Sequence, residues 1–342
     1  MKEALVSAGP KVRIVDSPVP KPNADQVLIK VVVSGSNPKD WKVPVWMNDD
    51  AHQGDDIAGI VHEVGSNVTE FKPGDRVAAF HEMTKPHGSY AEYAIAWQHT
   101  TFHIPQKTSF EDRDVDDYTE AAAIPLAAMT AAVGLYLRLG LPEPWRPATE
   151  PIPLVIYGAA SSVGAYTVQL AKRSNIHPLI CVAGKSGSYV ETLIDRSKGD
   201  TVIDYRDGDE AIVEGLKKAA GGAKLLHAFD AVAGHGSYVN LGKVLSEGSS
   251  MTLVLPPKED FPAHVEKSLT LVGTVHKEAK DFGFVYFRYL GRGLQEGWFK
   301  AQPQIVVPGG LGGIQKALED LKAGKANAVK FVFRIADTEG VE

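Results

Sequence analysis

The sequence contains almost no cysteine: Cys181 is the single thiol among 342 residues. One cysteine excludes an internal disulfide and any zinc site built from several thiolates. Cys181 lies in the apolar run Leu179–Ala183, which predicts a buried strand, and buried cysteines usually behave as small hydrophobic residues. We therefore expect neither a disulfide framework nor a catalytic thiol.

Long apolar runs and an excess of basic residues are also absent. No stretch of about 18 apolar residues occurs, so we expect no transmembrane helix, and the N-terminus shows no charged-then-apolar leader. Lys and Arg number 36 against 42 Asp and Glu, whereas nucleic acids and anionic membranes require clustered cations. We expect a cytoplasmic globular protein that binds neither nucleic acid nor a membrane.

The first third of the chain is predicted to be rich in β-structure. Val27–Val33, Gly54–Val64 and Asp75–Ala79 are short strand candidates separated by Gly, Pro and Asn. Short strands at this spacing predict a small barrel or sandwich. The pattern changes near residue 119, where Thr119–Leu139 is rich in alanine and has helical spacing.

Beyond a proline-rich connection, apolar strand candidates alternate with helix candidates. The predicted strands are 154–157, 178–183, 201–203, 228–232, 251–255 and 269–272. Continuous apolar strands between helices predict a parallel sheet covered on both faces. The tail from about residue 290 adds a helix and a strand and is expected to return to the first region. We therefore predict an α/β protein with two domains, 1–123 together with 290–342, and 124–289.

A loop of small residues joins the strand at 154–157 to the next helix. It consists of Gly158, Ala159, Ala160, Ser161, Ser162, Val163 and Gly164. Small side chains let backbone N–H groups approach a pyrophosphate, and a helix N-terminus supplies positive potential. Ala159 and Ser161 replace two glycines of the usual dinucleotide pattern. An ordinary βα turn is the alternative, but the alternating sheet favours dinucleotide binding.

The residues after the second strand of this region indicate which dinucleotide binds. Sites for NAD place a carboxylate there to bind the ribose 2′-hydroxyl, but this chain has Gly184, Lys185 and Ser186. We predict that they hold the 2′-phosphate of NADPH. Tyr205 and Arg206 follow the third strand and are placed to close over that phosphate. The alternative is that Lys185 and Arg206 are solvated surface charges.

Taken in order, these features resemble the medium-chain dehydrogenase/reductase superfamily, in its zinc-free quinone oxidoreductase and enoyl reductase branch. The resemblance is carried by segments 35–40, 54–61, 64–65, 73–77, 88–93, 121–132, 158–164 and 329–333. It implies a Rossmann doubly wound parallel sheet plus a GroES-like β-barrel domain, with the active site between them. It also implies a homodimer joined through the edges of the two Rossmann sheets.

The zinc-binding residues of other members of the superfamily are replaced in this chain. Asn37 stands where those enzymes have a cysteine, and Asp55 where they have a histidine. Four histidines lie near one another, with a spacing that fits no compact ligand set: His81, His87, His99 and His103. We therefore expect no metal.

The resemblance also implies site residues. Asn37 is expected to orient the nicotinamide or an acceptor carbonyl, although it also suits a turn before Pro38. Thr130 stands at a helix position that contacts the nicotinamide in the family, although it is also an ordinary helix hydroxyl. The further residues implied at the cofactor are Gly234, Val272, Gly273, Thr274 and Lys330.

A site without a metal favours conjugated acceptors, because the charge left by hydride addition spreads into an enolate or a ring. We predict an NADPH-dependent oxidoreductase that reduces a quinone, an enone or an enoyl thioester. One alternative is a stand-alone, trans-acting enoyl reductase with an acyl-carrier partner in a polyketide synthase; another is a non-catalytic NADPH-binding sensor or structural protein. The resemblance does not supply a proton donor: mitochondrial-type enoyl thioester reductases use a tyrosine shortly after the Asn-Pro segment, but Trp41–Gln53 contains no tyrosine.

Overall fold

The computed structural model describes residues 1–48, 54–105, 120–258 and 261–341. The chain forms two compact units: unit 1 is Met1–Leu126 with Gly273–Glu342, and unit 2 is Ala127–Val272. The sequence predicted the domain boundaries at 123/124 and 289/290. In the structure the units meet along the chain at 126/127 and 272/273, and the segment 273–289 belongs to unit 1.

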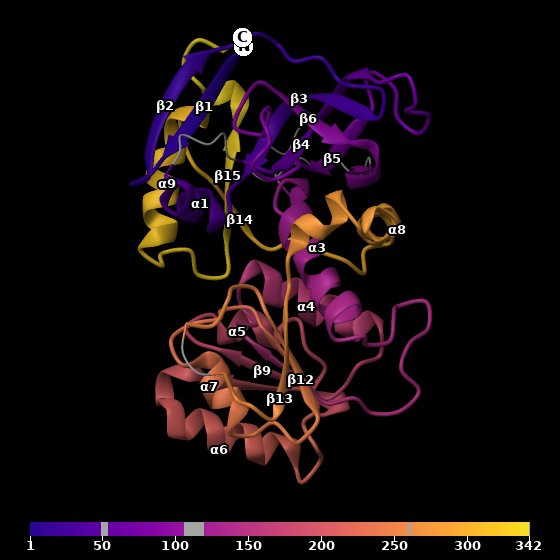
Figure 1. Ribbon diagram of the computed structural model, residues 1–342, viewed down its shortest axis with the longest axis vertical. Helices are drawn as coiled ribbons and strands as arrows, with labels where there is room; N and C mark the ends of the chain where they lie inside the picture. Colours follow the sequence, from indigo (N-terminus) through magenta and orange to yellow (C-terminus); the bar gives the residue numbers. More distant parts are fainter. Residues whose placement is uncertain (49–53, 106–119, 259–260, 342) are drawn as a thin grey trace. The chain divides into compact units, whose positions relative to one another are not determined.

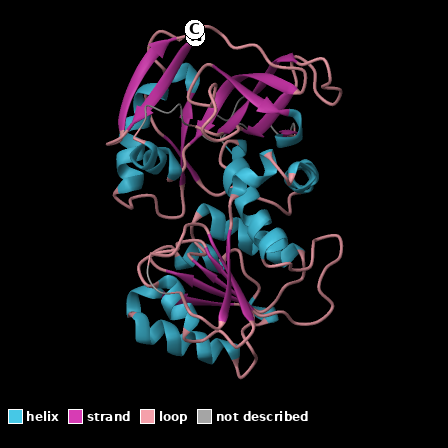
Figure 2. Cartoon of the chain, in the orientation of Figure 1, coloured by secondary structure: helices cyan, strands magenta, loops and turns pink. Residues whose placement is uncertain are grey.

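Unit 2 contains a six-stranded parallel sheet with the order β10-β9-β8-β11-β12-β13. Its strands are β8 (Leu154–Tyr157), β9 (Leu179–Ala183), β10 (Thr201–Asp204), β11 (His227–Asp230), β12 (Ser249–Leu253) and β13 (Val265–Leu269). The order reverses at β8, which is the arrangement of a Rossmann fold. Helices cover both faces (Figure 2), and the predicted doubly wound sheet is confirmed.

Five helices belong wholly or mainly to unit 2. They are α3 (Pro125–Ala132), α4 (Ser162–Arg173), α5 (Gly187–Glu191), α6 (Asp209–Ala220) and α7 (Ser237–Gly242). Pro125 begins α3, a position where proline's missing N–H and fixed φ are tolerated. The predicted helix at this place starts at Thr119, which lies outside the described residues.

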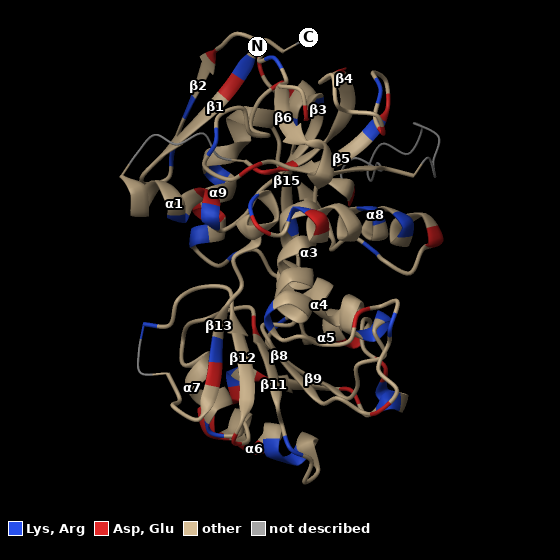
Figure 3. Cartoon of the chain, turned by 45° about the vertical axis from the view of Figure 1, so that its right-hand side comes forward, with Lys and Arg blue, Asp and Glu red and all other residues tan. Residues whose placement is uncertain are grey.

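The sixth strand of the sheet was predicted at the wrong place. The apolar run 269–272 predicted it, but β13 is the more polar segment Val265–Leu269, and Val272–His276 is a 3₁₀ turn. The inner strands are apolar because sheet neighbours and helices cover them, whereas β13 is an edge strand with charged residues (Figure 3). Cys181 on β9 is fully buried, and burial raises the pKa of its thiol.

Unit 1 contains a β-hairpin and a larger, mainly antiparallel sheet (Figure 1). The hairpin joins β1 (Lys2–Ser7) and β2 (Lys11–Asp16). The sheet has the order β14-β15-β3-β4-β5-β7, with β6 paired to β3. Its strands are β3 (Gln26–Gly35), β4 (Asp56–Val64), β5 (Arg76–Phe80), β6 (Tyr93–Trp97), β7 (Thr101–His103), β14 (Gln304–Val306) and β15 (Lys330–Arg334).

The described residues of unit 1 also form the helices α1 (Lys39–Met47), α8 (Lys280–Glu296) and α9 (Ile314–Lys322). The core lies between the curled sheet and α9, with Ile29, Ile57, Phe333 and Leu318 fully buried. In the described part of the chain, no helix combines the length and apolar character needed to cross a bilayer.

Candidate functional site

Two residues 293 positions apart meet at the end of strands β3 and β15. The antiparallel register pairs Val332 with Gly35, and Ser36 N donates to Phe331 O over 3.0 Å. The next pair along the same register is Asn37 and Lys330. Lys330 Nζ lies 2.7 Å from Asn37 Oδ1. Asn37 was predicted as a catalytic residue and Lys330 as a cofactor contact, and the structure brings the two into direct contact.

Asp56, the first residue of β4, completes this cluster. Its Oδ2 lies 2.7 Å from Lys330 Nζ and accepts from Asn37 Nδ2 over 2.8 Å. Its Oδ1 accepts from Leu126 N over 2.7 Å. A Cβ atom on Gly35 would stand 2.2 Å from the backbone oxygen of Ala122, which leaves no room for a side chain at this position. The close approach of segment 121–126 therefore requires glycine there.

A second group of charges surrounds Lys39, at the start of α1. Lys39 Nζ lies 2.6 Å from Asp55 Oδ2 and 3.1 Å from Asp40 Oδ1. Asp40 Oδ2 accepts from Asn37 N and from the Tyr90 hydroxyl, each over 2.6 Å. The carboxylates are buried, but 15% of the Lys39 side chain is exposed. Asp40 thus anchors the turn at Asn37.

The charges around Lys39 set its protonation. Burial acts to lower the pKa of the ammonium, but the carboxylates of Asp55 and Asp40 outweigh it and raise that pKa above the ordinary 10.5. Burial raises the pKa of Asp55, against the opposing effects of Lys39 and His81. Lys39 is therefore a partly accessible side chain that is protonated at pH 7.

Lys39, Asp55 and Asp56 were not predicted as members of a charged cluster. The pairs Lys39-Asp40 and Asp55-Asp56 are adjacent charged residues, and charged residues are almost never fully buried unless they are paired. Which of them pair is decided by the strand register, and the register involves residues far apart in the chain.

Three described histidines of unit 1 are at least partly buried within the fold: His81, His99 and His276. The two ring nitrogens of His81 lie 2.7 Å from Ile95 O and 3.0 Å from Lys85 O. Burial lowers the pKa of His276 to about 3 and also lowers that of His99, so both rings are neutral at pH 7. Among the described residues, no three His, Cys, Asp or Glu side chains are arranged to hold a metal ion.

The predicted dinucleotide loop in unit 2 connects β8 to α4. Gly158 has φ +80°, and Ser161 caps α4 by accepting from Gly164 N over 3.0 Å. A Cβ on Gly164 would stand 2.3 Å from Gly158 O, so the helix lies against the loop backbone. The loop therefore has the close packing that a pyrophosphate site at a helix N-terminus requires.

Gly184 and Tyr205 are in contact, as expected for the predicted 2′-phosphate site. A Cβ on Gly184 would stand 2.5 Å from the Tyr205 ring, which is 48% exposed. Lys185 is exposed beside them. Arg206 binds the carboxylate of Asp204 through Nε, over 2.9 and 3.0 Å, and lowers the pKa of that carboxyl to about 2. Arg206 is thus an exposed side chain that pairs with the neighbouring Asp204.

The turn after β11 contains Gly234. Asp230 Oδ1 accepts from Val232 N and Ala233 N over 2.9 and 2.8 Å, and Oδ2 accepts from the Ser237 hydroxyl. Asp230 therefore holds the turn. Because β8, β9, β10 and β11 are parallel, the segments 158–164, 184–186, 205–206 and 231–234 all lie at the carboxyl edge of one sheet.

The remaining predicted residues are divided between the units. Thr130 is a buried residue of α3 and belongs to unit 2. Val272 is the last residue of unit 2. Gly273 and Thr274 begin the second segment of unit 1, and the Thr274 hydroxyl donates to Glu278. A Cβ on Gly273 would stand 3.0 Å from Met83 Cε.

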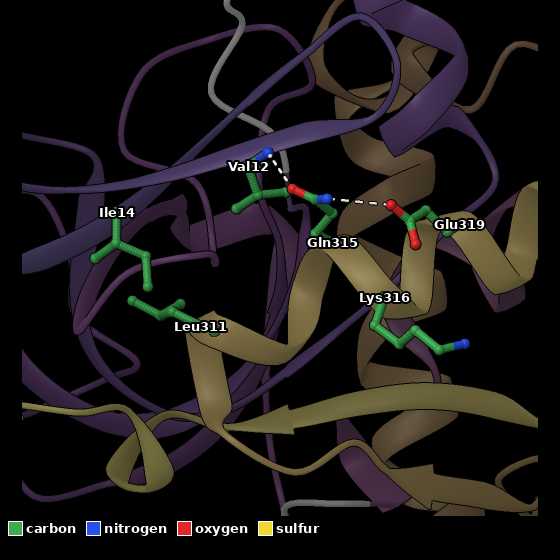
Figure 4. A pocket seen from close by; sticks show the side chains of 7 residues that line it. Val12, Ile14, Leu311, Gln315, Lys316 and Glu319 are labelled. Carbon is green, nitrogen blue, oxygen red and sulfur yellow. Dashed lines mark hydrogen bonds between the residues drawn. The ribbon is translucent and has the colours of Figure 1, made fainter.

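A cavity of about 300 Å³ lies elsewhere in unit 1, between β2 and α9 (Figure 4). Gln315 accepts from Val12 N over 3.2 Å and donates to Glu319 over 3.1 Å. The polar groups there cover the outer edge of β2, which is a common protection of edge strands. We do not assign a reaction to it.

Comparisons with known proteins find relatives that match over most of the chain. Residues 23–106 match the family model described as the alcohol dehydrogenase GroES-like domain. The trans-enoyl reductase fsr4 of Gibberella fujikuroi is 52% identical over 316 residues, which are 90% of this chain and 91% of the relative. The trans-enoyl reductase resD of Aspergillus sclerotiorum is 30% identical over 97% of this chain and 100% of its own.

Solved structures extend the likeness to the whole fold. The quinone oxidoreductase of Coxiella burnetii superposes with a TM-score of 0.73 and covers 98% of this chain and 99% of its own. Its sequence identity is 23%, so this likeness speaks for the fold alone.

Proposed function

We propose a function from the premise that this chain belongs to the medium-chain dehydrogenase/reductase superfamily, in its zinc-free quinone oxidoreductase and enoyl reductase branch. The proposed function is that of an NADPH-dependent enoyl reductase acting on an α,β-unsaturated thioester. The observation that carries the proposal is the Lys39 ammonium, held between Asp40 and Asp55 with part of its side chain exposed. It supplies the proton donor that the sequence did not reveal.

The proposed reaction saturates a carbon–carbon double bond. NADPH, when bound, supplies a hydride to the β-carbon of the thioester. The negative charge then collects on the thioester oxygen as an enolate, and the Lys39 ammonium stabilises it. Lys39 next gives its proton to the α-carbon and becomes a neutral amine. The amine takes a proton back from solvent through its exposed side, and the product is the saturated thioester.

The residues of unit 2 fit NADPH by their shape and charge. Gly158 and Gly164 let the start of α4 pack closely against the end of β8, and the N-terminus of α4 favours an anion. We propose that the loop 158–164 holds the pyrophosphate and that Lys185, Ser186 and Tyr205 hold the 2′-phosphate. The Arg206 guanidinium neutralises Asp204 at the same edge, which removes a repulsion against that phosphate.

The nicotinamide end is assigned by the family pattern. We propose that Gly234 lets the cofactor lie across β11 and that the backbone of 272–274 contacts the carboxamide. Asn37 and Thr130 are the proposed polar contacts to the nicotinamide or the acceptor carbonyl.

The proposal extends to partners. The relatives with 52% and 30% identity are named trans-enoyl reductases. We propose that this chain likewise acts in trans, on acyl thioesters held by the acyl-carrier domain of a separate polyketide synthase. We further propose a homodimer joined through the outer edges of the β13 strands, because a parallel sheet that ends at β13 leaves backbone groups for pairing with a second copy.

The first experiment compares acceptors for the purified protein. NADPH absorbance is followed with an α,β-unsaturated acyl thioester, a simple enone and an ortho-quinone, with NADH in parallel. We expect fast, NADPH-preferring reduction of the thioester. Turnover of the quinone or enone alone would replace this proposal by a general reductase of conjugated acceptors. NADPH binding without any turnover would favour the non-catalytic alternative, and a preference for NADH would contradict the role of Lys185.

A further inference from the structure

The Asn37 carboxamide is held at both ends by a buried ion pair. Asn37 Oδ1 accepts from Lys330 Nζ over 2.7 Å, and Nδ2 donates to Asp56 Oδ2 over 2.8 Å. Lys330 and Asp56 also contact each other over 2.7 Å. Asn37 is 3%, Lys330 4% and Asp56 0% exposed, so water does not replace these contacts.

This arrangement allows the amide only one orientation. An asparagine amide can usually exchange its oxygen and nitrogen by a half-turn, since both ends form hydrogen bonds. The ammonium of Lys330 can only donate, however, and the carboxylate of Asp56 can only accept. A turned amide would direct its N–H groups at the cation and its oxygen at the anion. In a buried site both contacts are strongly unfavourable.

Asp56 also reaches a second element. Its Oδ1 accepts from Leu126 N in the first turn of α3, where a carboxylate favours the positive end of the helix dipole. The helix α3 carries Thr130. One carboxylate is therefore bonded both to Asn37 and to the start of the helix that bears the other predicted catalytic residue.

Stability alone does not explain the charges in this cluster. Taking an ammonium and a carboxylate out of water is costly, and well-packed apolar pairs often stabilise a fold as well or better. A charged pair does have one property that an apolar pair lacks, because it discriminates between the two ends of an amide.

We propose that Lys330 and Asp56 are positioning residues, which act on the reaction through Asn37 by fixing the orientation of its amide. This inference rests on the proposed function, in which Asn37 contacts the nicotinamide or the acceptor carbonyl. It gives Lys330 a different role from the direct cofactor contact that the sequence suggested.

The test is a mutant cycle. The double variant D56N/K330Q removes both charges together and nearly preserves volume, so no unpaired charge remains buried. Asn and Gln both donate and accept, so they no longer select one orientation of Asn37. We expect kcat for thioester reduction to fall about tenfold, because misaligned contacts at a reacting centre are that costly. The deuterium isotope effect with 4-deuterated NADPH should rise as hydride transfer becomes slower.

Non-additivity separates positioning from direct contact. N37A alone should also lower kcat, and the triple variant N37A/D56N/K330Q should be no slower than N37A. The inference would be overturned if the fold losses of kcat in N37A and D56N/K330Q multiply in the triple variant. It would also be overturned if the kcat of the double variant equals that of the wild type. If the double variant does not fold, Lys330→Arg, which keeps the charge but moves the donors, takes its place in the cycle.

Two controls complete the design. D320N/K325Q makes the same chemical change at an exposed ion pair of 2.8 Å in unit 1 and should leave kcat unchanged. NADPH binding, measured by nicotinamide fluorescence, should stay within about threefold in D56N/K330Q, which shows that the site is intact. A wild-type protein without thioester reductase activity would refute the proposed function, whereas additive losses in an active enzyme would refute only the positioning role.

Discussion

At the residue scale, the chemistry of unit 1 depends on charges removed from water. Asp40, Asp55 and Asp56 are at most 1% exposed, and buried charges are stable only when they are paired. Lys39 and Lys330 supply the cations, but they differ in access. Lys39 is 15% exposed and Lys330 4%. Lys39 is therefore suited to exchanging a proton, and Lys330 to holding its neighbours.

Lys39→Met should slow thioester reduction by about 100-fold or more, because a positioned acid typically contributes that much. Affinity for NADPH, measured by fluorescence titration, should change little because the dinucleotide loop is elsewhere in the chain. Lys42→Met, on the same helix, is the matched control and should retain activity. Full activity of Lys39→Met would mean that another group or water delivers the proton.

The pH dependence of thioester reduction should reflect the raised pKa of Lys39. The reaction needs the protonated amine, and the nearby carboxylates hold its pKa above 10.5. We therefore expect kcat/KM to stay level from neutral pH upward and to fall only beyond about pH 10.5. A fall between pH 7 and 9, measured in buffers of constant ionic strength, would assign the acid to a different group.

Gly234 offers a test of the cofactor position that leaves the fold intact. A Cβ there has no protein atom closer than Val232 O, at 4.0 Å. Gly234→Ala should therefore change the free energy of unfolding by less than about 1 kcal/mol. Because the cofactor is proposed to cross β11 at this point, the dissociation constant for NADPH should rise at least tenfold. Unchanged NADPH binding would place the cofactor elsewhere.

At the element scale, the fit of α4 against the end of β8 creates the dinucleotide loop. Gly164 Cα lies so close to Gly158 O and Ala159 Cα that a methyl group would overlap both, at 2.3 and 2.7 Å. Backbone atoms at such distances cannot rotate away as the end of a side chain can. The helix must therefore move if Gly164 is replaced.

Gly164→Ala should lower the free energy of unfolding by about 1–3 kcal/mol, the usual cost of overpacking, and should also weaken NADPH binding. Chemical denaturation and fluorescence titration measure the two effects. Gly187→Ala on α5 is the control, since its Cβ would have Val202 Cγ1 at 3.7 Å, and stability should change by less than about 1 kcal/mol. Equal effects of both substitutions would contradict the close packing of α4.

At the scale of the whole molecule, the proposed chemistry is divided between two units. Unit 1 contains Asn37, Lys39 and Lys330, which are proposed to act on the acceptor. Unit 2 contains the loop 158–164 and Tyr205, which are proposed to bind NADPH. The chain crosses between the units at 126/127 and again at 272/273.

Lys267→Pro should convert the proposed homodimer to a monomer. Thr270 N donates to Leu253 O, so by alternation along the strand the N–H of Lys267 points to the outer edge of the sheet. Proline there spares the ladder with β12 and blocks pairing with a second copy. Sedimentation should give twice 36.8 kDa for the wild type and 36.8 kDa for the variant. A variant that stays dimeric would place the interface elsewhere.

Much of unit 2 could be predicted from local sequence. The strands around 154–157 and 179–183 are uninterrupted apolar runs, and the turns after them contain the small residues that a dinucleotide needs. These signals are local because each inner strand of a parallel sheet is buried on both faces. The edge strand β13 was misplaced because one side of it faces solvent, and its sequence Val-Glu-Lys-Ser-Leu has no apolar run.

The amino-acid sequence by itself determined the two-domain α/β class, the small-residue loop and the absence of a disulfide, because each follows from residues close together or from a single count. Only the tertiary structure decided that Lys330 meets Asn37 and Asp56, and that Asp40 and Asp55 share Lys39. Those contacts depend on the register of β3 against β15 and β4. The register between these strands is set by packing across the whole unit, so it cannot be predicted from a local sequence pattern.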